Sequence, residues 1–258
     1  MISFSSQTLA AVNFAAELFR AAKRAVVLTG AGLSTPSGIP DFRSEGTGLW
    51  SREEPLEVAS LSTFRIAPEK FFQWFRPLAA QIYHAQPNAA HYALAQLEQA
   101  GYVKAIITQN MDVLHQKAGS KNVIEMHGTL RTLSCTQCFC QVESAAFLVA
   151  FTQTGAIPRC PACGAILKPD VILFGEQLPQ KAWTQAQRAV RQCDLMLVAG
   201  SSLEVLPVAG LPMQALDRGA HLIILNNTPT YLNVRADASI LDDVARILPA
   251  IAERTLNG

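Results

Sequence analysis

The chain has 258 residues, 50% of them hydrophobic, and a formal net charge of +1. Its length allows one large domain, or a large domain and a small one, with a sizeable core. Lysine and arginine are spread along the chain rather than gathered into a basic stripe, so we expect no direct nucleic-acid contact. No apolar run approaches the roughly 20 residues that cross a bilayer, so we expect no membrane contact either.

The first 24 residues are interpreted as a packed helix. They lack the charged start and apolar run of a secretion signal, although their serine content and single acid, Glu17, leave a transit peptide as the alternative. Val12, Ala15 and Phe19 fall on one helical face, and an apolar strand follows almost at once. We therefore expect a cytoplasmic protein, and a monomer.

Apolar strands alternate with helical patterns along the chain. In chain order we expect a helix over 7–22, a strand over 25–29, a loop over 30–43, aromatic helices between 50 and 100, a strand over 103–108, a short helix before Gly119 and a strand within 122–128. A cysteine-rich segment follows over 130–168, then β character over 168–176, a helix over 179–192, a strand over 195–200, a helix over 208–218, a strand over 221–227 and a helix over 241–254. Within the aromatic stretch, prolines 55, 68, 77 and 87 are expected to divide the chain into short helices. Such alternation predicts an α/β fold with a parallel sheet, into which the aromatic and cysteine-rich segments are inserted.

Two C-x-x-C pairs predict a metal site. Cys135 and Cys138 form the first pair, Cys160 and Cys163 form the second, and 21 residues lie between the two pairs. Four thiolates in two tight turns make a closed tetrahedral cage for Zn²⁺, so we expect one structural zinc. Cys140 could replace Cys138 but is interpreted as a spectator, while Cys193, at a helix end, is interpreted as a buried thiol.

Polar residues follow four of the expected strands. They are GAG at 30–32, QNMD at 109–112, GSS at 200–202, and Asn226 with Asn227. Ligands bind outside the carboxyl ends of an open parallel sheet, so these four ends predict one ligand site. Gly30 and Gly32 would let the backbone approach phosphates, and Asn226 is a candidate for the ribose contact, although it is also a common turn residue.

The loop after the first strand departs from a dinucleotide fingerprint. G-x-G-x-x-G requires a third glycine at position 35, where Thr35 stands, and a Pro-Gly-Pro stretch follows in place of a helix. Hydroxyl groups of Ser34, Thr35 and Ser37 could bind phosphate. Asp41 and Arg43, directly downstream, are interpreted as part of the site rather than as ordinary loop charges. These departures argue against a conventional NAD dehydrogenase.

His127 is the candidate general base among five histidines. It follows a strand, precedes Gly128 and stands directly before the cysteine segment. A histidine with an ordinary pKa near 6.5 suits proton transfer at neutral pH. The other four histidines are interpreted as structural, and His84, His91 and His221 show no polar company in the sequence.

These motifs together resemble the sirtuins. GAGLSTPSGIPDFR, TQNMDVLHQKAG, the HG at 127–128, CTQC and CPAC, KPDVILFGE and GSSLEVLP occur in the sirtuin order, and the resemblance covers about residues 25–227. It implies a Rossmann-like NAD-binding domain (1–45, 91–128 and 169–258) that carries a helical module (46–90) and a zinc-ribbon module (129–168). It also implies NAD-dependent deacylation of lysine in a protein or peptide.

The resemblance also implies roles for individual residues. Catalysis would depend on His127 as general base, with Asn110 and Asp112. The NAD site would comprise Gly30, Ala31, Gly32, Ser34, Thr35, Asp41, Phe42, Arg43, Gln109, Asn110, Asp112, His127, Gly200, Ser201, Ser202 and Asn226. The acyl-lysine peptide would lie as an added strand against Ile172, Phe174, Gly175, Glu176, Leu203 and Val205.

NAD would be consumed, giving nicotinamide and O-acyl-ADP-ribose. Phe72 and Phe75 stand where succinyl-preferring sirtuins carry a Tyr-x-x-Arg pair, so we expect acetyl groups, with longer fatty acyl groups possible. A one-residue shift of this alignment would bring Arg76 into the acyl site. Mono-ADP-ribosyl transfer and a non-catalytic NAD sensor are the alternatives, and intact Asn110 and His127 favour deacylation.

Overall fold

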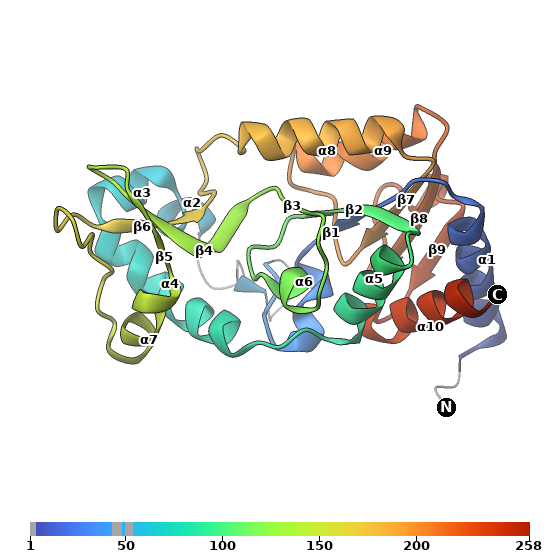
Figure 1. The fold of residues 1–258 in the computed structure, drawn as a ribbon, viewed down its shortest axis with the longest axis horizontal. Helices are drawn as coiled ribbons and strands as arrows, with labels where there is room; N and C mark the ends of the chain where they lie inside the picture. The colour runs from blue at the N-terminus through green and yellow to red at the C-terminus, as the bar shows by residue number, and fades with distance from the viewer. Residues whose placement is uncertain (1–3, 43–47, 50–53) are drawn as a thin grey trace.

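The computed structural model describes residues 4–42, 48–49 and 54–258. Six parallel strands form the main sheet, in the order β3-β2-β1-β7-β8-β9 (Figure 1). They are β1 (Ala25–Thr29), β2 (Val103–Thr108), β3 (Val123–Glu125), β7 (Leu195–Ala199), β8 (His221–Asn226) and β9 (Ala238–Leu241). Counted along the chain, this order reads 3-2-1-4-5-6, so β1 and β7 flank the switch point at which the order reverses.

Helices cover both faces of this sheet. One face carries α1 (Ser6–Ala21), α5 (Ala89–Gln99) and α10 (Val244–Asn257), and the other carries α8 (Gln180–Gln192) and α9 (Leu211–Leu216) (Figure 1). Successive strand residues point to opposite faces, so Val27 and Leu197 enter the first core and Leu28 and Val198 the second. The predicted α/β class with a parallel sheet is confirmed.

A second lobe lies beyond the carboxyl ends of the strands (Figure 1). It contains α2 (Pro55–Val58), α3 (Leu61–Ile66) and α4 (Pro68–His84), together with β4 (Gly128–Cys135), β5 (Gln141–Glu143), α7 (Ala145–Thr154) and β6 (Leu167–Val171). The three strands form an antiparallel sheet in the order β5-β4-β6. Phe72 and Phe75 of α4 contact the ring of Phe151 in α7, so the two inserted segments share one aromatic core.

The structure corrects two predictions about the elements. Pro77 does not divide the aromatic stretch, because α4 runs through it. Pro77 and Gln73 are both exposed, so water can reach the Gln73 carbonyl that loses its amide partner. The last helix begins at Val244 rather than 241, because residues 238–241 form the edge strand β9. Within the described ranges, no helix combines the length and apolarity that a bilayer crossing needs.

Candidate functional site

Three glycines bring the ends of β1 and β7 into direct backbone contact at the switch point. The Gly32 amide donates to the Gly200 carbonyl at 2.9 Å, and a Cβ on Gly30 would lie only 2.7 Å from that oxygen. Gly200 has φ +64°, and a Cβ there would lie 2.2 Å from the Leu33 amide nitrogen. Glycine is therefore required here for the packing of two loops, in addition to any approach to a phosphate.

A cavity of about 1080 Å³ opens at these strand ends. Most of the residues predicted for the NAD and peptide sites line it. They are Gly30, Ala31, Gly32, Thr35, Asp41, Phe42, Gln109, Asn110, His127, Ile172, Phe174, Gly175, Glu176, Gly200, Ser201, Ser202, Val205 and Asn226. Ser34, Asp112 and Leu203 lie behind the cavity wall, and Arg43 lies outside the described residues.

A buried hydrogen-bond network supports the cavity behind Asn110. The Ser34 hydroxyl donates to Asp112 at 2.6 Å, and the Asn110 amide donates to the Ser34 oxygen at 3.1 Å and to the Gly30 carbonyl at 3.0 Å. Burial raises the pKa of Asp112, and the bond from Ser34 opposes that rise. Val113 follows at φ 66°, a region that β-branched residues rarely occupy, and so turns the chain sharply after Asp112. The network holds the Asn110 side chain against the first loop.

His127 lies between β3 and β4, where the chain leaves the main sheet. Its Nδ1 lies 3.1 Å from the Gln109 carbonyl oxygen. A carbonyl only accepts, so Nδ1 carries the proton and the basic lone pair of the neutral ring is on Nε2. The His127 carbonyl accepts from the Ile172 amide at 2.9 Å, and a Cβ on Gly128 would lie 2.0 Å from the Asp170 carbonyl oxygen. The close packing of Gly128 against β6 thus sets the position of His127.

Gln109 ties two strand ends together across the cavity. Its amide donates to the Ser201 hydroxyl at 2.8 Å, and its backbone carbonyl accepts from His127. This residue therefore links β2, β7 and the candidate base through one side chain and one carbonyl.

His91 and His115 are buried, as expected of structural residues, and their rings lie 5.0 Å apart. His91 Nδ1 accepts from the Asn88 amide in the cap of α5. His115 Nε2 lies 3.0 Å from the Thr29 hydroxyl. His221 was expected to have no polar neighbour, but its Nδ1 lies 3.0 Å from the Asp237 carboxylate.

The buried histidine pair predicts acid sensitivity. Burial lowers the pKa of His91 to about 4, and burial and then the neighbouring His91 lower that of His115. Both rings stay neutral when folded but take up protons when unfolded near pH 6.5, so stability is full above that pH and falls toward pH 4. His91 alone should reduce the free energy of unfolding by about 2 kcal/mol between pH 7.5 and pH 5.

Urea unfolding at several pH values measures this loss. His91→Asn keeps an acceptor for the cap but removes the titration, so its stability should vary less with pH than that of the wild type. His84→Asn, at an exposed position of α4, is the control and should retain the wild-type dependence. Equal pH dependence in wild type and His91→Asn would contradict the assignment.

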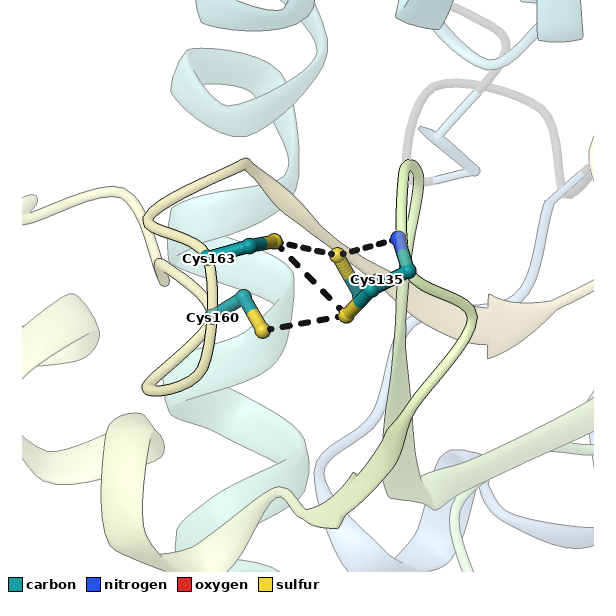
Figure 2. A group of neighbouring side chains, drawn as sticks. Cys135, Cys160 and Cys163 are labelled. Carbon is teal, nitrogen blue, oxygen red and sulfur yellow. Dashed lines mark hydrogen bonds between the residues drawn. The ribbon is translucent and has the colours of Figure 1, made fainter.

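Four cysteine sulfurs converge between β4 and the loop that precedes β6. Figure 2 shows the sulfurs of Cys160 and Cys163 directed at the turn that begins with Cys135. The Sγ atoms of Cys135 and Cys163 are 3.4 Å apart, Cys138 lies 3.6 Å from both Cys160 and Cys163, and all four lie within 4.8 Å of one another. A tetrahedron with Zn–S bonds of about 2.3 Å has edges near 3.8 Å, so this set fits a structural zinc.

The remaining two cysteines, Cys140 and Cys193, do not belong to the set of four. Cys140 Sγ contacts Cys160 at 3.3 Å but is not among the four that are mutually close, so the geometry selects Cys138 as the ligand. Cys193 is buried, and burial raises the pKa of its thiol to about 11, as expected of an inert side chain.

One part of the cavity is apolar and lies against α4. It is lined by Ala59, Phe71, Trp74, Phe75 and Leu173. Phe72 instead packs against Phe151 inside the aromatic core. Arg76 faces α7, where it donates to the carbonyls of Thr152 at 3.0 Å and Gln153 at 2.6 Å. Arg76 therefore caps the end of α7 and does not reach the apolar part of the cavity.

Two segments border the rest of the opening. Phe174 is already paired with the segment before α3, because its amide donates to Ala59 and its carbonyl accepts from Leu61. On the other side, Leu203 adopts φ 58° and its amide donates to the Ser201 hydroxyl. Any strand added at Phe174–Glu176 must therefore use backbone groups other than this Phe174 pair.

Several lining residues were not among the individual site residues predicted from the sequence. Met111 lies within the QNMD motif, and Trp183 comes from the first turns of α8. Asn227 and Thr228 extend the wall after Asn226. The tryptophan at the start of an amphipathic helix is indistinguishable from a core residue until the fold brings it to the cavity.

Residues 30–207 match the model of the Sir2 family. Over 243 residues the chain is 45% identical to NAD-dependent protein deacylase 2 of Archaeoglobus fulgidus, covering 94% of this chain and 95% of that protein. It is 46% identical over 220 residues to NAD-dependent protein deacetylase 1 of Geobacillus kaustophilus, covering 85% of this chain and 88% of that protein.

Solved structures agree with these matches. A structure on the mechanism and regulation of Sir2 enzymes has a TM-score of 0.89 at 44% identity, covering 96% of this chain and 98% of that one. Sir2Af2 bound to a myristoylated histone peptide has a TM-score of 0.83 at 39% identity, with coverage of 96% and 98%. The family predicted from the motifs is confirmed: this chain belongs to the Sir2 family, the sirtuins.

Proposed function

We propose that this sirtuin is an NAD-dependent protein lysine deacylase, with acetyl-lysine as its reference substrate. The observation that carries the proposal is the placement of His127, held by the Gln109 carbonyl in the wall of a large cavity at the switch point of a parallel sheet. Relatives named deacylase or deacetylase cover most of the chain at 44–46% identity.

NAD fits the polar part of the cavity. Bound there, it supplies an electrophilic ribose carbon and the hydroxyl groups that receive the acyl group. The turn at Gly30–Gly32 suits its phosphates, and Gln109 and Asn110 suit the nicotinamide side. Thr35 lines the same part of the cavity, and its hydroxyl donates to the Gly32 carbonyl at 3.1 Å, which supports the turn. Gly200, Ser201, Ser202 and Asn226 suit the adenosine half, and Ala31, Asp41, Phe42 and Arg43 complete the proposed site. Ser34 and Asp112 act from behind the wall by holding Asn110.

His127 acts as the general base. Its Nδ1 proton is committed to the Gln109 carbonyl, so Nε2 accepts the proton of a ribose hydroxyl as that oxygen attacks the acyl carbon. The close packing of Gly128 against Asp170 fixes the backbone next to His127, and the bond from Nδ1 to the Gln109 carbonyl orients the ring. The zinc ion, held by Cys135, Cys138, Cys160 and Cys163, has a full set of thiolates and serves structure only.

The acyl-lysine peptide enters between the segments Phe174–Glu176 and Leu203–Val205, next to Ile172. Sir2 structures with a myristoylated histone peptide and with a propionylated peptide support this class of substrate. The apolar part of the cavity, with Phe71, Trp74 and Phe75, receives the acyl group. A carboxylate placed there would be buried without a cationic partner among the described lining residues, which is costly.

Acyl preference provides the direct test. Acetyl and longer unbranched acyl peptides should be deacylated, and the succinyl peptide at least about 100-fold more slowly, because a buried unpaired charge costs several kcal/mol. Mass spectrometry of reactions with NAD should detect deacylated peptide, O-acyl-ADP-ribose and ADP-ribosylated protein separately.

Arg76→Gln sharpens the same test. Because Arg76 caps α7, its loss should leave the acetyl-to-succinyl ratio unchanged. A faster reaction with succinyl than with acetyl peptide would contradict the apolar site. ADP-ribosylated protein without deacylated peptide would instead support the transferase alternative.

The same proposal includes a cytoplasmic monomer that contacts neither nucleic acid nor membrane. It divides the chain into an NAD-binding domain over 1–45, 91–128 and 169–258, a helical module over 46–90 and a zinc-ribbon module over 129–168. The composition and the motif order support these parts.

A further inference from the structure

Helix α8 presents a basic stripe on its outer side. It contains Lys181, Arg188 and Arg191 and no acidic residue. Lys181 and Arg188 are seven positions apart, so they lie almost in line, and Arg191 lies about one turn further on. All three are exposed, whereas Ala186 and Val190 on the opposite side of the helix are buried in the core. Figure 1 shows α8 lying across the outside of the fold, above the main sheet.

The three cations of this stripe are not neutralised by the described part of the chain. Other surface cations do form ion pairs, with Lys70 bound to Glu57, Arg131 to Glu125 and Arg246 to Asp242. No described residue forms an ion pair or side-chain hydrogen bond with any cation of the stripe. Asp194, just beyond the helix, is committed to the backbone amides of residues 23 and 24. Arg188 and Arg191 are about one turn apart with no acidic residue between or beside them on α8, so their mutual repulsion lowers the stability of the helix.

The stripe begins at the proposed active site. Gln180 and Trp183, in the first turn of α8, line the cavity, and Lys181 stands between them. Arg191 is ten positions after Lys181 in the helix, which corresponds to a rise of about 15 Å. An extended peptide advances about 3.3 Å per residue, so a substrate that continues from the cavity along α8 passes all three cations within about five residues.

We propose that Lys181, Arg188 and Arg191 form a docking surface for an acidic segment of the protein substrate, outside the residues that surround the acyl-lysine. The proposal rests on the deacylase function. It selects a protein segment over nucleic acid, because DNA-binding proteins commonly contact about 6–10 phosphates and α8 offers three cations. Charges placed in this way mainly raise the rate of productive encounter, and their effect is screened by salt.

The test compares three acetyl-lysine peptides with the same core sequence. One has neutral flanks, one carries four aspartates about five to nine residues after the acetyl-lysine, and one carries them at the same distance before it. In low salt, kcat/KM of the wild type should be about fivefold to tenfold higher for one of the acidic peptides than for the neutral peptide. About 0.5 M NaCl should remove this preference.

The variant combines Lys181→Gln, Arg188→Gln and Arg191→Gln, because glutamine is already frequent on α8 and preserves the helix. It should lose the acidic preference and keep the wild-type kcat/KM for the neutral peptide. The matched control neutralises Lys23, Lys104 and Lys121, three exposed cations at the amino ends of strands, away from the cavity. The control loses the same net charge and should keep the preference.

Three results would overturn the proposal: the wild type has the same kcat/KM for all three peptides, the α8 variant keeps the preference for an acidic peptide, or the control variant loses that preference as fully as the α8 variant does. Tighter binding of a 20-base-pair DNA duplex than of the acidic peptides, lost in the α8 variant, would assign the stripe to nucleic acid instead. If the wild type deacylated none of the three peptides, the proposed deacylase function itself would fail. Fluorescence anisotropy of labelled peptides would then show separately whether the acidic segment binds α8.

Discussion

Cys160→Ser should deprive the protein of its metal, unfold the zinc-ribbon module and abolish deacylation. Cys160 is buried, and its sulfur lies 3.6 Å from that of Cys138 in the mutually close set of four. Zinc binding contributes about 10–16 kcal/mol in zinc-finger peptides, where folding and metal binding are one event. The small core at this site has only Leu133, Cys135, Cys160 and Leu167 as its buried described residues, and it cannot replace that contribution.

The loss should spread beyond the module. Strand β4 carries Cys135 at one end and Gly128 at the other, directly beside His127. Val171 at the end of β6 also packs in the aromatic core that α4 and α7 share. Disorder in β4 and β6 therefore removes the support of the proposed general base and of the apolar cavity wall.

Elemental analysis and thermal unfolding measure this prediction. Wild-type protein should carry about one zinc per chain, Cys160→Ser close to none, and its melting temperature should fall by more than about 10 °C. Cys140→Ser is the matched control, because Cys140 lies next to the cluster but outside the set of four. Equal zinc loss in Cys140→Ser would place Cys140 among the ligands, and full zinc retention in Cys160→Ser would contradict the site.

His127→Ala should lower the rate of deacylation by about 10²–10⁴-fold while the protein stays folded. Removal of the ring leaves no group at the Nε2 position to take the proton of the ribose hydroxyl. The ring is half-buried, so its loss affects chemistry more than packing. Circular dichroism and zinc content should match the wild type.

Single-turnover assays with acetyl peptide and NAD measure the rate, and NAD binding is measured separately by calorimetry. His84→Ala, an exposed histidine on α4, is the control and should retain wild-type activity. Wild-type turnover by His127→Ala would refute the assignment of the base. Loss of NAD binding in this variant would show that the ring serves binding rather than proton transfer.

The strands of the main sheet were the most predictable part of the fold. Residues 25–29 and 103–108 form strands with the predicted bounds, because a strand buried on both faces is a continuous apolar run with polar residues directly after it. Strand β9 was missed, since it lies at the edge, alternates buried and exposed residues and passes at once into α10. Four residues of alternating pattern beside a helix carry too little signal to separate the two elements.

The prolines show where local rules give way to packing. Pro55 and Pro68 begin α2 and α4, a position at which the missing amide costs nothing. Pro77 costs about 3 kcal/mol inside a helix, yet α4 continues because six of its side chains are buried in the aromatic core. Burial of one large apolar side chain contributes about 1.5–3 kcal/mol, so the packed face outweighs the defect.

The polar residues at strand ends were predictable as a group, but their orientations were not. Ser34 was expected to offer a hydroxyl to phosphate, and its hydroxyl instead donates to the buried Asp112. Trp183 reaches the cavity from a helix far along the chain. Such contacts depend on how α8 and the first loop pack against the sheet, and no local pattern in either segment records that packing.

The cap on α7 bears on how this scaffold could acquire a new specificity. Arg76 directly follows Phe75, which lines the cavity, so the sequence alone would allow a small rotation of the helix to bring its charge to an acidic acyl group. In the fold, its guanidinium satisfies two carbonyls at a helix end, where Gly155 leaves room for it. Recruiting Arg76 would expose those carbonyls, whereas a new arginine at position 75 would cost aromatic packing. A change toward dicarboxylic acyl groups at position 75 or 76 therefore carries a structural penalty in either case.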